Sequence, residues 1–397
     1  MIKRCLTIRL RVLYAVLCLL AFGPGTKAFG QANPPLWSAS STYKIGDLAQ
    51  YANETYRAIT AMPAGKVQVP ANPSYWEMNE VRVSDTLSVG AQQQLPNLAT
   101  AWKYILNARI DGSAVLALNL ISNETLTTSF NLDHPCGSAI QLTTSNGASV
   151  TFGSSAASST GFVLDSGHSF GGIFNLTLNG SVEVGGTPSV AVLVSTGGNM
   201  KLMGITINNF DTGIQAQDNS TIIIGSGVAT NGFDFAAVYS LNHSLIDIQS
   251  PMNIAGATSF NTPQSQYGFY ASGNATLEAN SCACRFCGAC YIADKGAHME
   301  AASATATNEG IDGVGFLANT GGTIEATGSG VTLCRTGYLS EYKSLINAPN
   351  CKCNDTSPDT DFVASISSLI NASGQTGGTQ FSPPKNTQST DGSYIVD

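Results

Sequence analysis

The chain has 397 residues, of which 43% are hydrophobic and only 11% are charged. This hydrophobic content can fill a core and excludes an intrinsically disordered chain, and many glycines with few charges are typical of an all-β, loop-rich protein. The net charge of −8 argues against a nucleic-acid-binding protein, which needs basic surface.

Residues 1–30 have the pattern of an export signal. A basic start precedes an apolar run at 12–22, and the segment ends in the small-x-small sequence Ala28-Phe29-Gly30. The run is short for a membrane span, so we expect cleavage before Gln31 and no span afterwards. An uncleaved anchor is the alternative. The sequence therefore predicts a secreted or cell-surface protein, periplasmic or extracellular.

Residues 31–80 form a short segment rich in aromatic residues. Alternation over 48–51 and 55–59 predicts a hairpin around Asn53-Glu54. A segment of this size has a small core, so its aromatic residues must supply much of it. On this interpretation Tyr43, Tyr51 and Tyr56 are core residues.

The order of residues in this segment is similar to a known family. The order is Trp37, then Tyr43-Lys-Ile-Gly46-Asp47, Leu48-Ala-Gln-Tyr51, Tyr56-Arg-Ala58, Pro70 and a closing Trp76. It resembles the chitin-binding type of carbohydrate-binding module, families 5 and 12. The resemblance implies that polysaccharide stacks on exposed rings, with Trp76 matching the family's exposed ring and Tyr75 and Trp37 as the next candidates. Where many relatives carry an aromatic pair, this chain has Ile59-Thr60-Ala61-Met62.

Residues 81–94 have no strong periodicity and are interpreted as a linker. The next segment, 95–108, predicts a helix, because Leu98, Trp102, Ile105 and Leu106 recur at helical spacing. Pro96 suits its first turn. Strand signals follow at 114–121, 126–130 and 134–142.

A repeat then occupies much of the chain. Copies of a pattern with two short apolar strands around a polar turn start every 22 to 31 residues, at Gly213, Ala237, Gly268, Cys290, Gly315 and Gly337. A period of this size indicates a solenoid. No copy contains a helical pattern, so we expect an all-β parallel β-helix over 95–348 and a flexible tail over 349–397.

The order of elements from the helix onward is also similar to known proteins. The helix ending at Ile110, the strand at 114–121 and the sequence His134-Pro135-Cys136-Gly137 with Ile140 resemble phage tail-spike and pectate-lyase-like proteins. The residues 382–395 resemble the ends of such chains. The resemblance implies a right-handed coil with an N-terminal cap helix, and a homotrimer as one assembly. The predicted export signal at residues 1–30 is a difference from the phage proteins.

The sequence Cys282-x-Cys284-x2-Cys287-x2-Cys290 is the sharpest candidate for metal chemistry. Its spacing is found in iron–sulfur and zinc sites. The alternative is that these are packed thiols or disulfides of the solenoid, since the cluster lies in a strand-and-corner stretch of an exported chain. We adopt that alternative, and expect no metal and no cofactor.

Many β-helices are polysaccharide hydrolases or lyases, yet no catalytic constellation is evident. Hydrolysis needs two carboxylates that flank the bond. Asp294, His298 and Glu300 cluster around one turn, where such residues are usually solvated. Arg285 and Arg335 are the only arginines of the repeat, which equips a lyase poorly. Catalytic residues therefore stay unassigned.

The sequence predicts an exported polysaccharide-binding protein that uses Trp37, Tyr75 and Trp76, with the β-helix as a scaffold or adhesin shaft. Two alternatives stay open. One is a β-helix glycoside hydrolase or polysaccharide lyase, and the other is a tail-spike-like structural protein.

Overall fold

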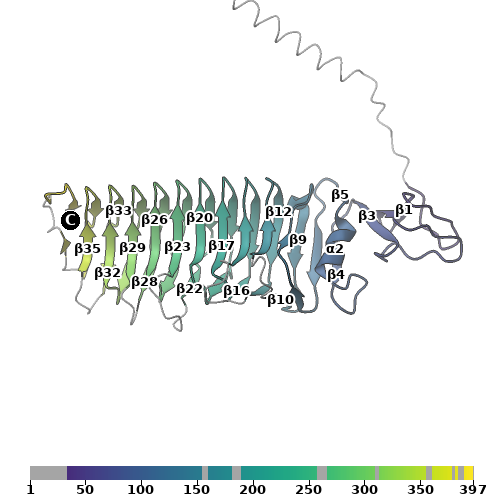
Figure 1. Ribbon diagram of the computed structural model, residues 1–397, viewed down its shortest axis with the longest axis horizontal. Coiled ribbons are helices and arrows are strands. Elements are labelled where there is room, and N and C mark those ends of the chain that lie inside the picture. Colours follow the sequence, from purple (N-terminus) through teal and green to yellow (C-terminus); the bar gives the residue numbers. More distant parts are fainter. Residues whose placement is uncertain are drawn as a thin grey trace, which may run out of the picture.

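The computed structural model describes residues 34–153, 160–180, 189–256, 266–308, 313–354, 360–377, 381–382 and 389–396. The predicted export signal lies outside these ranges. Within them, three long parallel sheets run side by side along one elongated stack, with a small module at its N-terminal end (Figure 1). None of the helices in these ranges combines the length and the apolar character that crossing a membrane requires.

From β6 to β36 each of the three sheets takes every third strand, so each turn of the chain adds one strand to each sheet. The 13-stranded sheet contains β4 (Asp85–Val89), β6 (Leu116–Leu120), β9 (Ile140–Thr143), β12 (Ser169–Phe174), β15 (Asn199–Met203), β18 (Thr221–Ile224), β21 (Leu245–Ile248), β24 (Thr276–Glu278), β27 (His298–Glu300), β30 (Thr323–Glu325), β33 (Leu345–Asn347), β36 (Leu369–Asn371) and β38 (Tyr394–Val396). The 10-stranded sheet contains β7 (Glu124–Leu126), β10 (Ser149–Phe152), β13 (Thr177–Asn179), β16 (Thr206–Asn208), β19 (Ala229–Asn231), β22 (Asn253–Ala255), β25 (Ala283–Arg285), β28 (Thr305–Thr307), β31 (Gly330–Thr332) and β34 (Lys352–Cys353). The 11-stranded sheet contains β8 (Phe130–Asn131), β11 (Thr160–Leu164), β14 (Val190–Val194), β17 (Thr212–Gln217), β20 (Ala236–Leu241), β23 (Tyr267–Ser272), β26 (Ala289–Asp294), β29 (Val314–Ala318), β32 (Thr336–Ser340), β35 (Thr360–Ala364) and β37 (Phe381–Ser382). This arrangement is consistent with the predicted parallel β-helix.

The interior is built from columns of identical strand positions on successive turns. One column holds five fully buried rings, in the order Phe269, Tyr291, Phe316, Tyr338 and Phe362. Neighbouring rings are nearly parallel, with centroids 4.7 to 5.1 Å apart. The spacing follows from the distance between paired strands, about 4.8 Å. Strand alternation points one set of side chains inward, and the parallel register then stacks them.

The helix α2 (Leu98–Ile105) lies between the module and the first turns (Figure 1). It is shorter than predicted, because the side chain of Asn97 accepts the N–H of Thr100 and starts it after Pro96. Leu98, Ala101, Tyr104 and Ile105 are its buried residues. Trp102 is half-buried and Leu106 is exposed, so Leu106 does not share the buried face of Leu98 and Ile105.

Two polar side chains of the first turns hold the ends of α2. The carboxylate of Glu124 accepts the backbone N–H of Leu98 at 2.9 Å, where the helix dipole favours negative charge. At the other end, Nε2 of buried His134 donates to the carbonyl oxygen of Ile105 at 3.0 Å, and its Nδ1 accepts the N–H of Cys136. Burial lowers the pKa of His134, which keeps the ring neutral. The His-Pro sequence therefore anchors the helix to the solenoid.

The solenoid is longer than the sequence predicts. Within the expected linker, β4 pairs in parallel with β6, so the first strand of the 13-stranded sheet precedes α2. Within the expected tail, β35 and β36 continue two sheets, and Phe362, Ile370 and Ile395 are fully buried. The interpretations of linker and flexible tail are therefore wrong for the described residues there. Their strands are short, and Asp361 of β35 stands where the earlier copies have Gly315 and Gly337.

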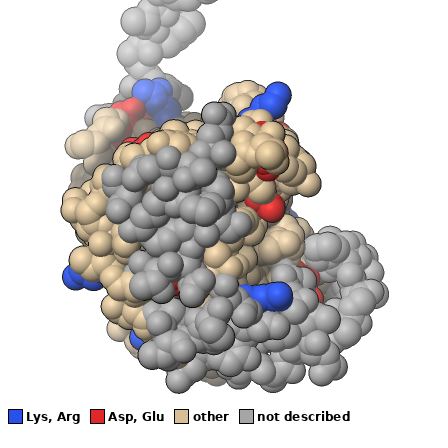
Figure 2. Space-filling model, turned by 90° about the vertical axis from the view of Figure 1, so that its left-hand side faces the viewer, with Lys and Arg blue, Asp and Glu red and all other residues tan. Residues whose placement is uncertain are grey.

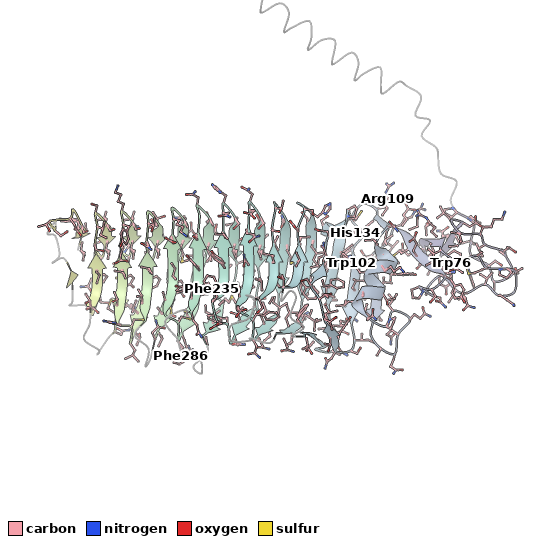
Figure 3. The ribbon with its side chains drawn as sticks, viewed as in Figure 1. Trp76, Trp102, Arg109, His134, Phe235 and Phe286 are labelled. Carbon is pink, nitrogen blue, oxygen red and sulfur yellow. The ribbon has the colours of Figure 1, made fainter. Side chains whose placement is uncertain are left out.

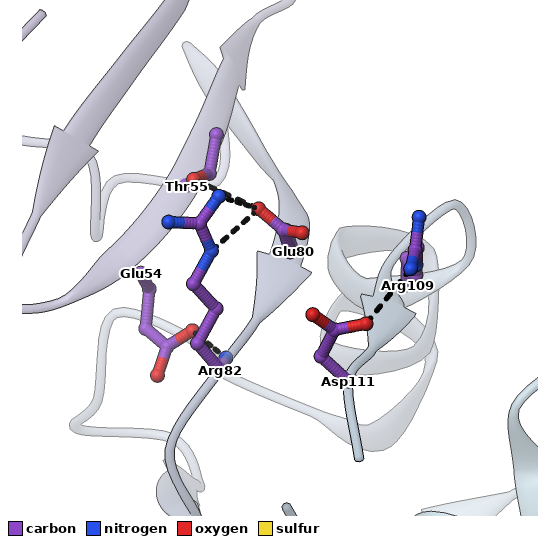
Figure 4. A network of polar contacts seen from close by, with 6 residues as sticks. All are labelled: Glu54, Thr55, Glu80, Arg82, Arg109 and Asp111. Carbon is purple, nitrogen blue, oxygen red and sulfur yellow. Dashed lines mark hydrogen bonds and ion pairs between the residues drawn. The ribbon is translucent and has the colours of Figure 1, made fainter. Parts of the chain in front are cut away.

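The N-terminal module is a separate small sheet of β1 (Leu48–Tyr51), β2 (Glu54–Ala58), β3 (Trp76–Val81) and β5 (Arg109–Ile110). The predicted hairpin is confirmed, with Ala52 and Asn53 at positive φ in its turn. The parallel pairing of β3 with β5 joins the module to the solenoid. At this junction Arg82 forms an ion pair with Glu80 at 2.7 Å and donates its backbone N–H to Glu54 (Figure 4).

Charged side chains are sparse on the described part of the surface at the C-terminal end of the molecule (Figure 2). Figure 2 views the molecule from the end that carries the C-terminus, and the few blue and red side chains are scattered among uncharged ones. The composition leads to the same expectation, because only 11% of residues are charged.

Candidate functional site

The structure separates the three rings proposed to bind polysaccharide. Trp76 is fully buried in the module (Figure 3), where its Nε1 donates to the carbonyl oxygen of Gln68 at 2.9 Å and its ring packs edge-on against Tyr43. A ring without an exposed face cannot stack on a sugar. The prediction for Trp76 is therefore corrected: it closes the core of the module.

Trp37 and Tyr75 are half-buried against the module core. The ring of Trp37 meets that of Tyr51 edge-on at 5.5 Å, and Tyr51 is 37% exposed. Leu36 and Ile45 are also exposed on the module. The interpretation of Tyr51 as a core residue is wrong, because the start of the hairpin turn leaves its ring at the surface. Trp37 with Tyr51 is the aromatic pair that the module presents.

A larger group of rings lies on the outer face of the 11-stranded sheet. We call Phe235, Tyr239, Tyr267 and Tyr270 the ring cluster; Phe235 lies in the middle of the stack in Figure 3. Tyr239 and Tyr270 occupy paired positions of β20 and β23, and their rings are stacked with centroids 4.8 Å apart. Phe235 lies 5.5 Å from both Tyr239 and Tyr267. All four side chains are half-buried.

The sheet explains why these rings face outward. On each strand of the 11-stranded sheet, inward residues such as Val238 and Phe269 are fully buried, and the next residue points to the opposite face. Tyr239 and Tyr270 follow those two residues, and Ile292 occupies the same position one turn later. Parallel pairing without a register shift then stacks the two outward rings.

An acidic group borders the ring cluster. Asp294, at the end of β26, accepts the hydroxyl of Tyr270 at 3.4 Å and lies 3.9 Å from the ammonium of Lys295. Asp294 is only 8% exposed, and its Oδ1 has no hydrogen-bond partner among the described residues. Burial, and then the charge of Asp294, raise the pKa of Tyr239 and Tyr270. Both hydroxyls therefore stay protonated and can donate.

The acidic trio considered from the sequence is divided between two sheets. His298 and Glu300 lie on one face of β27, with Nε2 and Oε1 3.9 Å apart, whereas Asp294 belongs to the 11-stranded sheet beside Tyr270. Glu300 instead joins a row of carboxylates in register along the 13-stranded sheet, which contains Asp247, Glu278, Glu300 and Glu325. Burial, and then the charges of Asp247 and Glu300, raise the pKa of Glu278.

The cysteines of the repeat are buried, and no disulfide joins any two of them in the part of the chain that the structure describes. The sulfur atoms of Cys284, Cys287 and Cys290 all lie within 4.8 Å of one another. Burial raises the pKa of the Cys284 and Cys290 thiols, whereas hydrogen bonds from those two thiols lower the pKa of Cys287. Cys287 is therefore the member of the trio that most readily carries negative charge.

Neither a protein-family model nor a curated protein matches this chain. We therefore infer the function from the geometry of these groups. Sequence reasoning missed the ring cluster, although the repeat contains its signal. In the copies Ala237-Val238-Tyr239 and Gly268-Phe269-Tyr270, the tyrosine follows an inward residue and so must face outward.

Proposed function

We propose that the protein binds polysaccharide through the ring cluster on the 11-stranded sheet. The observation that carries the proposal is the pair of stacked, half-buried tyrosines with a nearly buried carboxylate beside them. Rings with an apolar face and a polar edge suit sugars, which present both C–H surfaces and hydroxyl groups. The hydroxyl of Tyr239 supplies a donor for a sugar oxygen, and Asp294 accepts the hydroxyl of Tyr270 and so orients its ring.

The module extends the same function. Trp37 and Tyr51 present a second aromatic surface, and Tyr75 is half-buried on the same small domain. We assign Trp37 and Tyr75 to polysaccharide contact, as the resemblance to a chitin-binding type of module implies, and add Tyr51. Two aromatic sites on one elongated chain favour a polymer over a small sugar, because binding at one site raises the effective concentration at the other.

The test is retention on insoluble chitin and binding to a panel of soluble neutral and acidic polysaccharides. Wild-type protein should be retained on at least one of them, and Tyr239→Ala and Tyr270→Ala should weaken binding about tenfold, or about 1.4 kcal/mol. Tyr342→Ala is the matched control, because this tyrosine is 51% exposed outside the ring cluster. Unchanged binding by both cluster variants, at wild-type stability, would remove the cluster from the function.

We also propose the location, handedness and capping that the sequence predicts. The protein is exported after loss of residues 1–30 and acts outside the cytoplasm, at a cell surface or in a matrix. The coil is right-handed and α2 caps it, which its position beside the first turns and its buried face support. A trimeric shaft like that of a tail spike is the structural alternative. N-terminal sequencing of the exported protein and its molar mass in solution test these features.

A glycoside hydrolase is the second candidate, and the carboxylate row of the 13-stranded sheet favours it. Neighbouring members of the row are one strand spacing apart, about 4.8 Å along the stack. Glycosidases need one protonated and one ionised carboxyl group. The raised pKa of Glu278 favours its protonated form, and the carboxyl groups of Asp247 and Glu300 lie beside it. The release of reducing ends from a polysaccharide would establish hydrolase activity if Glu278→Gln abolishes it and Glu341→Gln, outside the row, does not. No release from any glycan of the panel would sink it.

A further inference from the structure

Three cysteines converge because one turn of the solenoid bends between two sheets at their position. Cys284 is the inward residue of β25, Cys287 lies in the corner that follows, and Cys290 is the second residue of β26. Spacing by three residues thus brings a strand residue, a corner residue and a residue of the next strand to the same interior point. All three are at most 1% exposed, and their sulfur atoms lie within 4.8 Å of one another.

The neighbouring turns leave room for this group. On the preceding turn Gly268 lies against it, and a Cβ at Gly268 would stand 2.5 Å from the sulfur of Cys284. On the following turn the fully buried Asn308 directs its Oδ1 toward the group, 3.5 Å from the sulfur of Cys290. The same oxygen accepts the backbone N–H of Cys287 at 3.0 Å. A carboxamide oxygen therefore adjoins the three sulfurs.

We propose that Cys284, Cys287 and Cys290 bind a single thiolate-preferring metal ion of the zinc or copper(I) class. Tetrahedral zinc with bonds of about 2.3 Å holds its sulfur ligands about 3.8 Å apart, so only a small contraction of the trio is needed. Soft thiolate ligands select such ions over calcium or magnesium. Binding displaces protons from the thiols, and Asn308 holds the Cys287 backbone and offers a fourth donor.

Two further cysteines, Cys351 and Cys353, lie in a later turn and can be compared with the trio. Cys353 lies in the same inward column as Cys284, three turns later, through Ala306 and Val331. Cys351 takes the place that Cys282 has in the earlier turn. The later turn has Cys353 and Cys351 but no equivalent of Cys290, because Asp361, the second residue of β35, stands at the corresponding strand position after the corner. A thiol in this column is thus common to both places, and the three-sulfur geometry belongs to the first.

The experiment measures metal in the full mature chain, purified with thiols protected from air and equilibrated with Zn²⁺ or, separately, Cu⁺. One equivalent per chain is expected, with about three sulfur neighbours at about 2.3 Å by X-ray absorption. Cys284→Ser and Cys290→Ser should retain less than a tenth of the metal, whereas Cys353→Ser should retain all of it.

Three results would overturn the proposal. The first is that wild-type protein stays metal-free under both conditions. The second is that mass spectrometry of that protein finds a disulfide within the trio, and the third is that all three variants retain equal amounts of metal. If the serine variants do not fold, X-ray absorption on the wild-type protein decides alone. The readout is metal content, so it stands apart from the polysaccharide proposal.

Discussion

The ring of Tyr291 lies on the ring of Phe316, with centroids 4.7 Å apart and an angle of 8° between their planes. Both rings are fully buried, and each also stacks on a further ring of the column. The column therefore links consecutive turns through contacts that are non-local in sequence. Its members are the largest apolar groups of this part of the interior, so the stability of the stack depends on them.

Removing a ring from the column should destabilise the solenoid. We expect Phe316→Ala to lower the free energy of unfolding by about 3 to 5 kcal/mol, because it deletes a buried ring and leaves a cavity. Leu317→Ala, at the outward position next to it, should cost less than half of that. Denaturant unfolding measures both. An equal cost for the two variants would contradict the inward assignment of Phe316.

The space beside Cys284 should tolerate no side chain at Gly268. A Cβ there would also stand 2.5 Å from the carbonyl oxygen of Cys290, and backbone moves aside only at a cost. We expect Gly268→Ala to destabilise the protein by about 1 to 3 kcal/mol. Gly330→Ala is the control, since its nearest neighbour is 3.7 Å away, and it should change stability by less than about 1 kcal/mol. Thermal unfolding of the two variants compares them, and an unaffected Gly268→Ala protein would refute the close packing.

Trp76 should matter for the folding of the module. Trp76→Ala should cost about 3 to 5 kcal/mol of module stability, because it removes a fully buried ring and leaves the Gln68 carbonyl without its donor. Trp37→Ala, at a half-buried ring, should cost much less and should instead weaken retention on polysaccharide. Proteolysis of the module and pull-down on chitin separate the effects. A stable Trp76→Ala module that no longer binds glycan would restore Trp76 as a ligand residue.

Glu54 should make the module less stable as the pH rises. Burial raises the pKa of Glu54 to about 7, above its ordinary value of 4.5. The folded state then holds the proton more tightly than the unfolded state, so stability is full below pH 4.5 and falls as the pH rises to about 7. Glu54→Gln should remove this fall and stabilise the module at pH 8 by up to about 3 kcal/mol. Unfolding curves at pH 4 and pH 8 test this, and identical pH profiles for both proteins would disprove it.

Much of the fold is legible in the chain because its determinants are local. Inward and outward residues alternate along each strand, and the repeat Gly268-Phe-Tyr-Ala against Gly315-Phe-Leu-Ala shows the register directly. The extent of the solenoid was harder to predict. The first strand, β4, is separated from its partner β6 by a helix, and no periodic signal crosses that gap.

The sequence alone determined that the chain is a β-rich repeat with a short aromatic module before it, because alternation and turn residues act over a few positions. The tertiary structure alone decided which groups meet. Trp76 is inside since Tyr43, which is distant in the chain, and the nearer carbonyl oxygen of Gln68 complete its surroundings. Tyr239 and Tyr270, a full turn apart, become one surface only through parallel pairing. Which side chains are exposed, and which of them come together, depends on neighbours from other parts of the chain. The spacing of residues along the sequence does not reveal those neighbours.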